Sequence, residues 1–126
     1  MPTFDPSTNR VDKGRYGETI AAGYLRARGH QILQTRYKCP YGEIDLITRQ
    51  GDTIVFAEVK LRKSQKSGPG AESVTPAKQR RLINAARHYI STQNPGLETY
   101  RFDVLDIFGR EFYTVNHIED AFYAES

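Results

Sequence analysis

Two short segments contain most of the residues that could do chemistry. They are Gly42–Ile47, with the sequence GEIDLI, and Phe56–Lys60, with the sequence FAEVK. Asp45 thus lies in one predicted strand, and Glu58 and Lys60 lie in the next. Charged groups taken out of water must be paired, bound to a metal or neutralised. The pattern therefore favours a metal-dependent hydrolytic site, with a buried ion-pair cluster as the alternative.

The turn between these segments predicts which residues face each other. Residues 51–52 are Gly-Asp, and glycine is preferred at the first position of a type II′ hairpin turn. Counting outward, Asp45 faces Glu58 and Glu43 faces Lys60, all on one face of the sheet. Opposed Cβ atoms lie roughly 4.5–5.5 Å apart, which suits two carboxylates sharing a hard divalent cation. Without a cation, repulsion raises the pKa of one carboxyl group.

Hydrophobic periodicity and turn residues predict the elements that position these side chains. Helices are expected at 12–28 and 75–93, strands at 30–38, 43–50, 53–61, 101–108 and 112–117, and a short terminal helix at 118–123. Thr75 is a suitable N-cap, followed by proline at the first helical position. The strand at 53–61 is mostly apolar on both faces, as in a central strand that is covered on both sides. The order α-β-β-β-α-β-β predicts an α/β fold whose central mixed sheet is flanked by helices.

Length and composition exclude several classes of protein. The 126 residues, 38% hydrophobic and 26% charged, are consistent with one domain at 12–126 after a flexible lead-in at 1–11. Cys39 is the single cysteine, so an intrachain disulfide or a cysteine-based zinc site is excluded. No apolar run is long enough to span a membrane, and no signal-peptide pattern opens the chain. A cytoplasmic protein that does not contact the membrane is expected.

Charge is distributed unevenly although the net charge is only +3. Between residues 60 and 81 Glu72 is the only acid, whereas basic residues are frequent. The side chains expected to contact nucleic acid are Arg62, Lys63, Lys66, Lys78, Arg80 and Arg81. A basic region beside carboxylates suits a polyanion, because lysine and arginine bind phosphates. The alternative is a solvated charged surface. Residues 62–73 are expected to form a mobile loop beside the carboxylates.

The spacing of these residues resembles a known nuclease motif. An Asp, twelve intervening residues and Glu-x-Lys, here Asp45 to Lys60, resemble the core of the PD-(D/E)xK nuclease superfamily, with Ile44 in place of a frequent proline. A helical glutamate at Glu18 narrows the likeness to archaeal Holliday-junction resolvases. The amino-acid sequence is similar to that of the YraN-like family of bacterial endonuclease-like proteins at residues 17–25, 42–47, 58–60 and 101–104. The resemblance covers about residues 12–123 and implies a restriction-endonuclease-like, three-layer α/β/α fold.

The resemblance also implies roles for individual residues. The catalytic set would be Glu18, Asp45, Glu58, Lys60 and Gln79. Asp45, Glu58 and the carbonyl of Val59 would bind Mg²⁺ or Mn²⁺, and Glu18 would complete the metal shell directly or through water. Lys60 would orient or deprotonate the attacking water. Gln79 matches a helical glutamine of several branches. Oxygen ligands without cysteine fit Mg²⁺ or Mn²⁺ better than zinc.

Two functions follow from this reading. The first is a metal-dependent DNA endonuclease, acting on branched or structured DNA as junction resolvases do. The alternative is a non-catalytic nucleic-acid-binding module of the same fold. Junction resolvases cut as symmetric homodimers, and an apolar strip at Phe108, Phe112 and Tyr113 is a candidate dimer surface, with core packing as the alternative.

Other polar residues are assigned no chemistry. Asp103 is expected to be structural and paired with Arg101 or with a backbone amide. His30, His88 and His117 lie far apart in the sequence without ligand spacing, and are expected to be non-catalytic.

Overall fold

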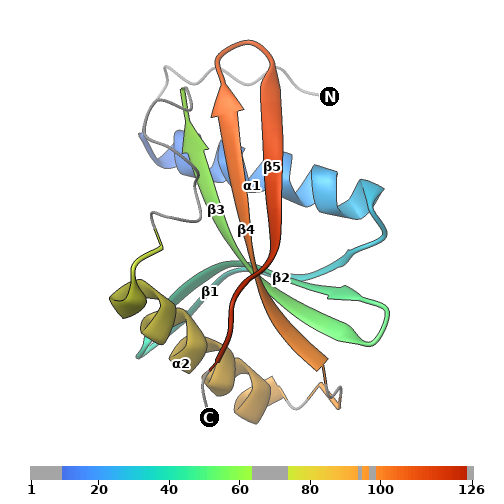
Figure 1. Cartoon of the computed structure of the whole chain (residues 1–126), viewed down its shortest axis with the longest axis vertical. Helices are drawn as coiled ribbons and strands as arrows, with labels where there is room; N and C mark the ends of the chain where they lie inside the picture. The colour runs from blue at the N-terminus through green and yellow to red at the C-terminus, as the bar shows by residue number, and fades with distance from the viewer. Residues whose placement is uncertain (1–9, 64–73, 94, 97–98, 125–126) are drawn as a thin grey trace.

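Five strands form one mixed sheet in a computed structural model of the chain, which describes residues 10–63, 74–93, 95–96 and 99–124, with side chains from residue 16 onward (Figure 1). They are β1 (Gln31–Cys39), β2 (Gly42–Gln50), β3 (Thr53–Arg62), β4 (Thr99–Gly109) and β5 (Tyr113–Phe122), and they lie side by side in that order. Only β3 and β4 are parallel in this described sheet; the other neighbours are antiparallel. A parallel pair needs a crossover connection, and the segment containing α2 provides it.

The two helices of the described chain cover opposite faces of this sheet. On one face, α1 (Arg10–Ala27) packs Ala21 and Leu25 against a cluster that includes Leu105. On the other, α2 (Pro76–Gln93) contributes Leu82, Ala85, Ala86 and Tyr89 to a larger core. The result is the expected three-layer α/β/α arrangement, with the strands strongly twisted between the helices (Figure 1).

Local sequence explains where the helices begin and how closely they pack. The Thr75 side chain accepts a hydrogen bond from the Lys78 amide at 3.3 Å, which confirms the predicted N-cap of α2. Gly17 brings α1 close to the sheet, because a Cβ at this position would lie 3.2 Å from the Cβ of Leu61 on β3. Glu18 follows directly, so this close approach also fixes the distance of its side chain from the sheet.

The C-terminal prediction was wrong in one element. Residues 118–122 were expected to begin a short helix but continue β5, which pairs with β4 on both sides of an irregularity. Asp120 has a positive φ of 52° there, and its amide donates to the Asp103 carboxylate at 3.2 Å. Beyond it, the Phe122 ring stacks on Phe102 with centroids 4.8 Å apart. These long-range contacts outweigh a short helical pattern, which is marginal by itself.

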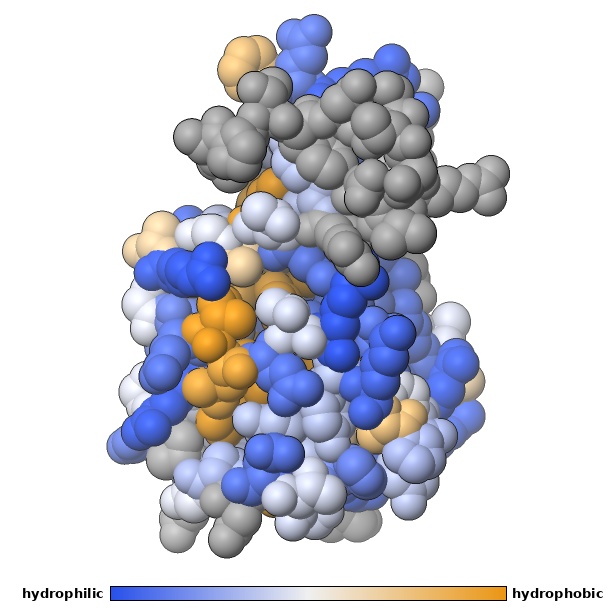
Figure 2. All heavy atoms as spheres, turned by 180° about the vertical axis from the view of Figure 1, so that it is seen from behind, coloured by the Kyte–Doolittle hydropathy of each residue, from blue (hydrophilic) through white to orange (hydrophobic). Residues whose placement is uncertain are grey.

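The remaining boundaries are close to the predicted ones. Helix α1 begins at Arg10, two residues before the expected start, and the rest of the predicted lead-in lies outside the described residues. Residues 64–73 of the predicted mobile loop, including Lys66, also lie outside them. No described helix is both long and apolar enough to cross a membrane. The face of the molecule shown in Figure 2 is mostly hydrophilic and is crossed by one band of apolar side chains.

Candidate metal and nucleic-acid site

The hairpin of β2 and β3 opens where the candidate carboxylates lie. The predicted register holds from Gln50↔Thr53 to Leu46↔Ala57, but within these two fully described strands the backbone ladder ends there. The predicted pairs Asp45–Glu58 and Glu43–Lys60 are therefore not backbone partners, because counting outward from a turn assumes that the strands stay together. Instead the Val59 amide donates to Oδ2 of Asp45 at 2.8 Å.

Asp45 is the most strongly perturbed carboxyl group of this site. Burial, followed by the negative charge of Glu58, raises the pKa of Asp45 to about 7, although the bond from the Val59 amide works in the opposite direction. Glu58 is itself buried, with 8% of its surface exposed. The fold therefore holds a half-buried and a buried carboxyl group close together, an arrangement that a bound cation would stabilise.

Two lysines surround Glu58. The Nζ atom of Lys78, in the first turn of α2, lies 2.6 Å from Oε1 of Glu58, whereas Nζ of Lys60 lies 4.0 Å from the same oxygen. Hydrogen bonding to Lys78, burial and repulsion from that second ammonium lower the pKa of Lys60. Burial alone would lower the pKa of Lys78 too, but its bond to Glu58 outweighs this and the pKa is raised. The sequence motif predicted Lys60 here, whereas Lys78 was expected only to contact nucleic acid.

Glu18 is held by an arginine that sequence reasoning missed. Nε of Arg36 on β1 donates to both carboxylate oxygens of Glu18, at 2.9 and 3.1 Å. Arg36 has a positive φ of 52°, an uncommon conformation for a residue with a side chain. Asp45 is close enough for its charge to raise the pKa of Arg36 slightly, after the larger effect of Glu18. Glu18 and Arg36 therefore belong to the same charged constellation as Asp45.

The donor set fits a hard divalent cation in part. In the described part of the chain, no group of three or more His, Cys, Asp or Glu side chains is arranged to hold a metal ion by itself. Asp45 and Glu58 supply two carboxylates, and the carbonyl of Val59 is an oxygen donor on the same strand. Mg²⁺ is commonly bound by one or two carboxylates together with water and substrate phosphates. The residues present fit that mode of binding, and not a complete protein cage.

The structure separates the other expected site residues into groups. Gln79 follows Lys78, but its side-chain amide donates to the Val74 carbonyl at 3.0 Å. Arg62 forms a two-pronged ion pair with the fully buried Asp106, at 2.9 and 2.7 Å. Lys63, Arg80 and Arg81 are exposed. The sequence did not predict that Asp106 pairs with Arg62, because its only indication was an aspartate inside an apolar strand.

A second group of buried polar residues lies on β4 and β5. Asp103 accepts hydrogen bonds from Arg101 at 2.9 Å, from the Asp120 amide, and on Oδ2 from a ring nitrogen of His117 at 2.7 Å. Burial would raise the pKa of Asp103, but the bonds from His117 and Arg101 outweigh it and hold the pKa below its usual value. The prediction of a structural Asp103 paired with Arg101 is confirmed. His30 lies beside His117, with ring centroids 6.3 Å apart, although the two are distant in sequence.

Comparison with known proteins places this arrangement in a family. The model described as "Uncharacterised protein family UPF0102" matches residues 17–107, the span that contains Glu18, Asp45, Glu58 and Lys60. A UPF0102 protein of Chlorobium chlorochromatii (strain CaD3) is 39% identical over 129 residues, covering 97% of this chain and 99% of its own. One from Nitrosococcus oceani is 42% identical over 123 residues, covering 96% and 98%. The chain therefore belongs to the UPF0102 family, the YraN-like family that its motifs resemble.

Proposed function

We propose that this protein is a metal-dependent DNA endonuclease. The observation that carries the proposal is the meeting of Asp45 and Glu58 where β2 and β3 separate, with the pKa of Asp45 raised to about 7. A carboxyl pair held in this way is costly for stability, and a divalent cation would relieve the repulsion. Buried, perturbed carboxyl groups are more frequent at functional sites than elsewhere.

The residues around this pair have the chemistry that phosphodiester hydrolysis needs. Asp45, Glu58 and the carbonyl of Val59 would hold Mg²⁺ or Mn²⁺, which when bound activates water and polarises the phosphoryl oxygen. Lys60, whose pKa is lowered, would orient the attacking water or take its proton. The Lys78 ammonium, 2.6 Å from Glu58, would give way to the cation when it binds. Glu18, oriented by Arg36, would complete the metal shell directly or through water.

The substrate class proposed is DNA with branched or structured segments, which rests on the resemblance to junction resolvases. Exposed Lys63, Arg80 and Arg81 would contact backbone phosphates near the site. A cytoplasmic location is part of the proposal, because the chromosomal DNA of bacteria lies there. A symmetric homodimer would place two sites for paired cuts, and Phe112, which is 88% exposed, belongs to the candidate dimer strip.

One observation favours the alternative, a non-catalytic nucleic-acid-binding module. The Lys78 ammonium lies 2.6 Å from Glu58 and balances its charge without a metal ion. If this ion pair persists in the presence of Mg²⁺, Glu58 is a structural partner of the helix and the site does not hydrolyse DNA.

The test is cleavage of labelled duplex, single-stranded, flap and four-way-junction DNA in Mg²⁺, in Mn²⁺ and in EDTA. Asp45→Asn removes a charge from the site while keeping an acceptor for the Val59 amide. Asp52→Asn makes the same chemical change in the exposed turn between β2 and β3 and serves as the matched control. We expect metal-dependent cleavage by the wild type and the control, and a loss of at least about a hundredfold in Asp45→Asn, as when one group that stabilises the transition state is removed.

The outcomes separate the two functions. Cleavage abolished only in Asp45→Asn, with DNA binding in EDTA retained, establishes the endonuclease. Binding without cleavage of any DNA in either metal supports the non-catalytic module and rejects the proposed enzyme.

A further inference from the structure

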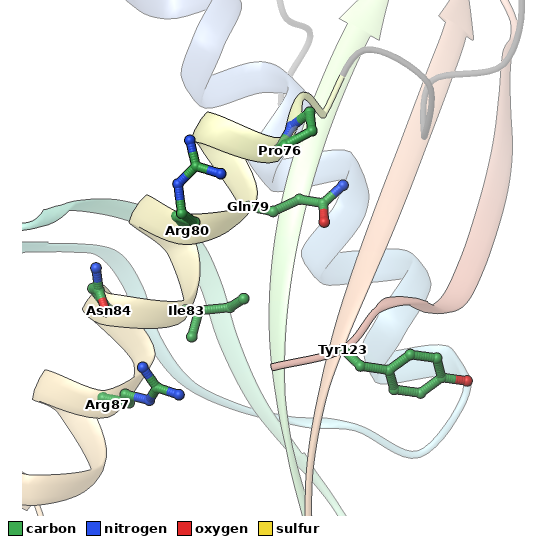
Figure 3. Close-up of a pocket in the computed structure, with 7 residues that line it drawn as sticks. All are labelled: Pro76, Gln79, Arg80, Ile83, Asn84, Arg87 and Tyr123. Atoms are coloured by element: carbon green, nitrogen blue, oxygen red, sulfur yellow. The ribbon is translucent and has the colours of Figure 1, made fainter. Parts of the chain in front are cut away.

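A groove runs along the surface of α2. It has a volume of about 400 Å³ and lies between α2 and the segment that follows β5. Figure 3 shows Arg80, Asn84 and Arg87 along the helix, with Gln79 and Ile83 directed toward the gap. Tyr123 stands across the gap with its ring turned away from the helix.

The lining combines the groups that recognise a nucleotide. Arg80 and Arg87 are exposed guanidinium groups, one at each end of the stretch, and guanidinium binds phosphate in two-pronged geometry. Between them the Asn84 amide can both donate to and accept from base edges. Ile83 is half-buried and provides an apolar floor on which a base can rest. Tyr123 is 73% exposed, so its ring, which is turned away from the helix in Figure 3, can rotate to provide an aromatic face at the rim.

The helix that forms one wall is strongly basic. Its 18 described residues include Lys78, Arg80, Arg81 and Arg87, and no acidic residue. Gln79 joins the groove to the candidate site, since it lines the groove and is the neighbour in sequence of Lys78, which contacts Glu58. Two of these cations, Arg80 and Arg87, line the groove and would attract a polyanion to it.

The volume and lining of the groove favour an unpaired strand over a duplex as its ligand. A hollow of about 400 Å³ falls in the range of roughly 300–1,000 Å³ that is typical of small-ligand sites. Duplex DNA has a convex surface, and proteins read it by inserting an element into its grooves. A hollow with cations, an amide and an exposed ring instead suits a base that is already unstacked.

From this geometry we propose that the α2 groove binds an unpaired stretch of one DNA strand next to the candidate active site. Arg80 and Arg87 contact its phosphates, a base lies over Ile83 within reach of Asn84, and the next base stacks on Tyr123. The assignment rests on the proposed function only in taking DNA as the polyanion. It adds that the protein selects DNA with a single-stranded portion beside the cut.

The experiment is fluorescence anisotropy of the full chain in EDTA with a labelled 20-nucleotide oligothymidine and with a duplex of equal length. The test variant is Arg80→Gln with Arg87→Gln, and the control is Arg26→Gln with Arg110→Gln. The control removes the same charge at exposed positions on α1 and in the β4–β5 turn. Tyr123→Ala is paired with Tyr41→Ala, an exposed aromatic residue in the turn between β1 and β2 that does not line the groove. Circular dichroism of each variant verifies folding.

We expect the double groove variant to bind the single strand at least about tenfold more weakly. The slope of the logarithm of its affinity against the logarithm of salt concentration should become shallower by about 0.7 for each phosphate that the variant no longer neutralises. The loss of affinity for the duplex should be smaller. Tyr123→Ala should weaken single-strand binding about fivefold or more, and both controls should stay near wild type. The groove assignment would be overturned if the affinity for single strand and for duplex fell equally, or if the controls lost as much affinity as the groove variants. It would also be overturned if the wild type did not bind the single strand.

The assay keeps the two proposals separable, because binding in EDTA does not depend on catalysis. Metal-dependent cleavage with normal single-strand binding by the groove variants would reject the groove and leave the endonuclease intact. Selective weakening of single-strand binding in a protein that never cuts would retain the groove and reject the enzyme.

Discussion

Asp45 and Asp103 are aspartates of the same sheet, yet their surroundings differ in every respect that matters for charge. Asp103 receives bonds from Arg101, His117 and a backbone amide, and its pKa is lowered. Asp45 receives one backbone amide, has a buried glutamate as its neighbour, and its pKa is raised to about 7. One carboxylate is neutralised by the protein itself, and the other is not.

The difference shows how a structural carboxylate can be told from a functional one. Around Asp103 the donors come from β4 and β5, so the network holds the edge of the sheet together. At Asp45 the strands separate, the ladder ends, and the Lys78 ammonium contacts Glu58 instead. A site that keeps acceptor capacity and unfavourable charge after folding is suited to bind a cation that the chain does not supply.

The largest expected effect on stability comes from disrupting the Asp103 network. Asp103→Asn leaves Arg101 and His117, with side chains 17% and 6% exposed, without their anion. Breaking a buried ion pair by removing one partner costs about 3–5 kcal/mol. Asp45→Asn should change the free energy of unfolding by less than about 1 kcal/mol, or increase it, because it removes repulsion. Urea unfolding of both variants in EDTA measures this, and equal destabilisation would contradict the contrast.

Metal binding should stabilise only one of the two regions. Mg²⁺ at about one hundred times its dissociation constant should add about 2.7 kcal/mol to the free energy of unfolding. Asp45→Asn should remove most of this gain, whereas a variant at the exposed Asp52 should keep it. Thermal unfolding with and without Mg²⁺ measures the effect. The same gain in wild type and Asp45→Asn would mean that the metal binds elsewhere.

The pH dependence of stability should have opposite signs at the two aspartates. The folded pKa of Asp103 is below the unfolded value, so its contribution is present above pH 4 and is lost as the pH falls through the folded pKa. The folded pKa of Asp45 is about 7, so its contribution is greatest below pH 4 and declines as the pH rises toward 7. In EDTA, Asp45→Asn should therefore flatten the decline between pH 4 and 7. A variant with the wild-type profile would contradict the raised pKa.

The smallest expected effect is on the affinity for Mg²⁺ and concerns Lys78, whose ammonium balances the charge of Glu58 in place of a metal ion. Lys78→Gln removes the ammonium that lies 2.6 Å from Glu58. Exposed ion pairs contribute about 0.2–1 kcal/mol, and the Lys78 side chain is 29% exposed. The affinity for Mg²⁺ should therefore rise by about fivefold as competition for Glu58 disappears. Isothermal titration with Mg²⁺ measures this, and Lys63→Gln is the matched control. Weaker binding by Lys78→Gln would show that this lysine assembles the site instead of competing with the metal.

The sequence predicted the parts of the site that depend on local order. The turn at 51–52 fixed the pairing of β2 and β3 as far as Leu46↔Ala57, since side-chain alternation and a two-residue turn leave one register. The sequence did not predict where the backbone ladder between β2 and β3 ends. It also did not predict Arg36 beside Glu18 or Asp106 beside Arg62, since each pair joins residues from different elements.

By itself, the sequence determined α1, α2, the five strands and their order, although not the second half of β5, because hydrophobic period, caps and turn residues act over a few positions. It also determined that Asp45, Glu58 and Lys60 lie near one another. The tertiary structure decided which charges are already balanced. Lys78 reaches Glu58, His117 reaches Asp103, and residues 118–122 form a strand only because packing brings distant segments together. Charge balance depends on distances in space, and spacing along the chain does not encode them.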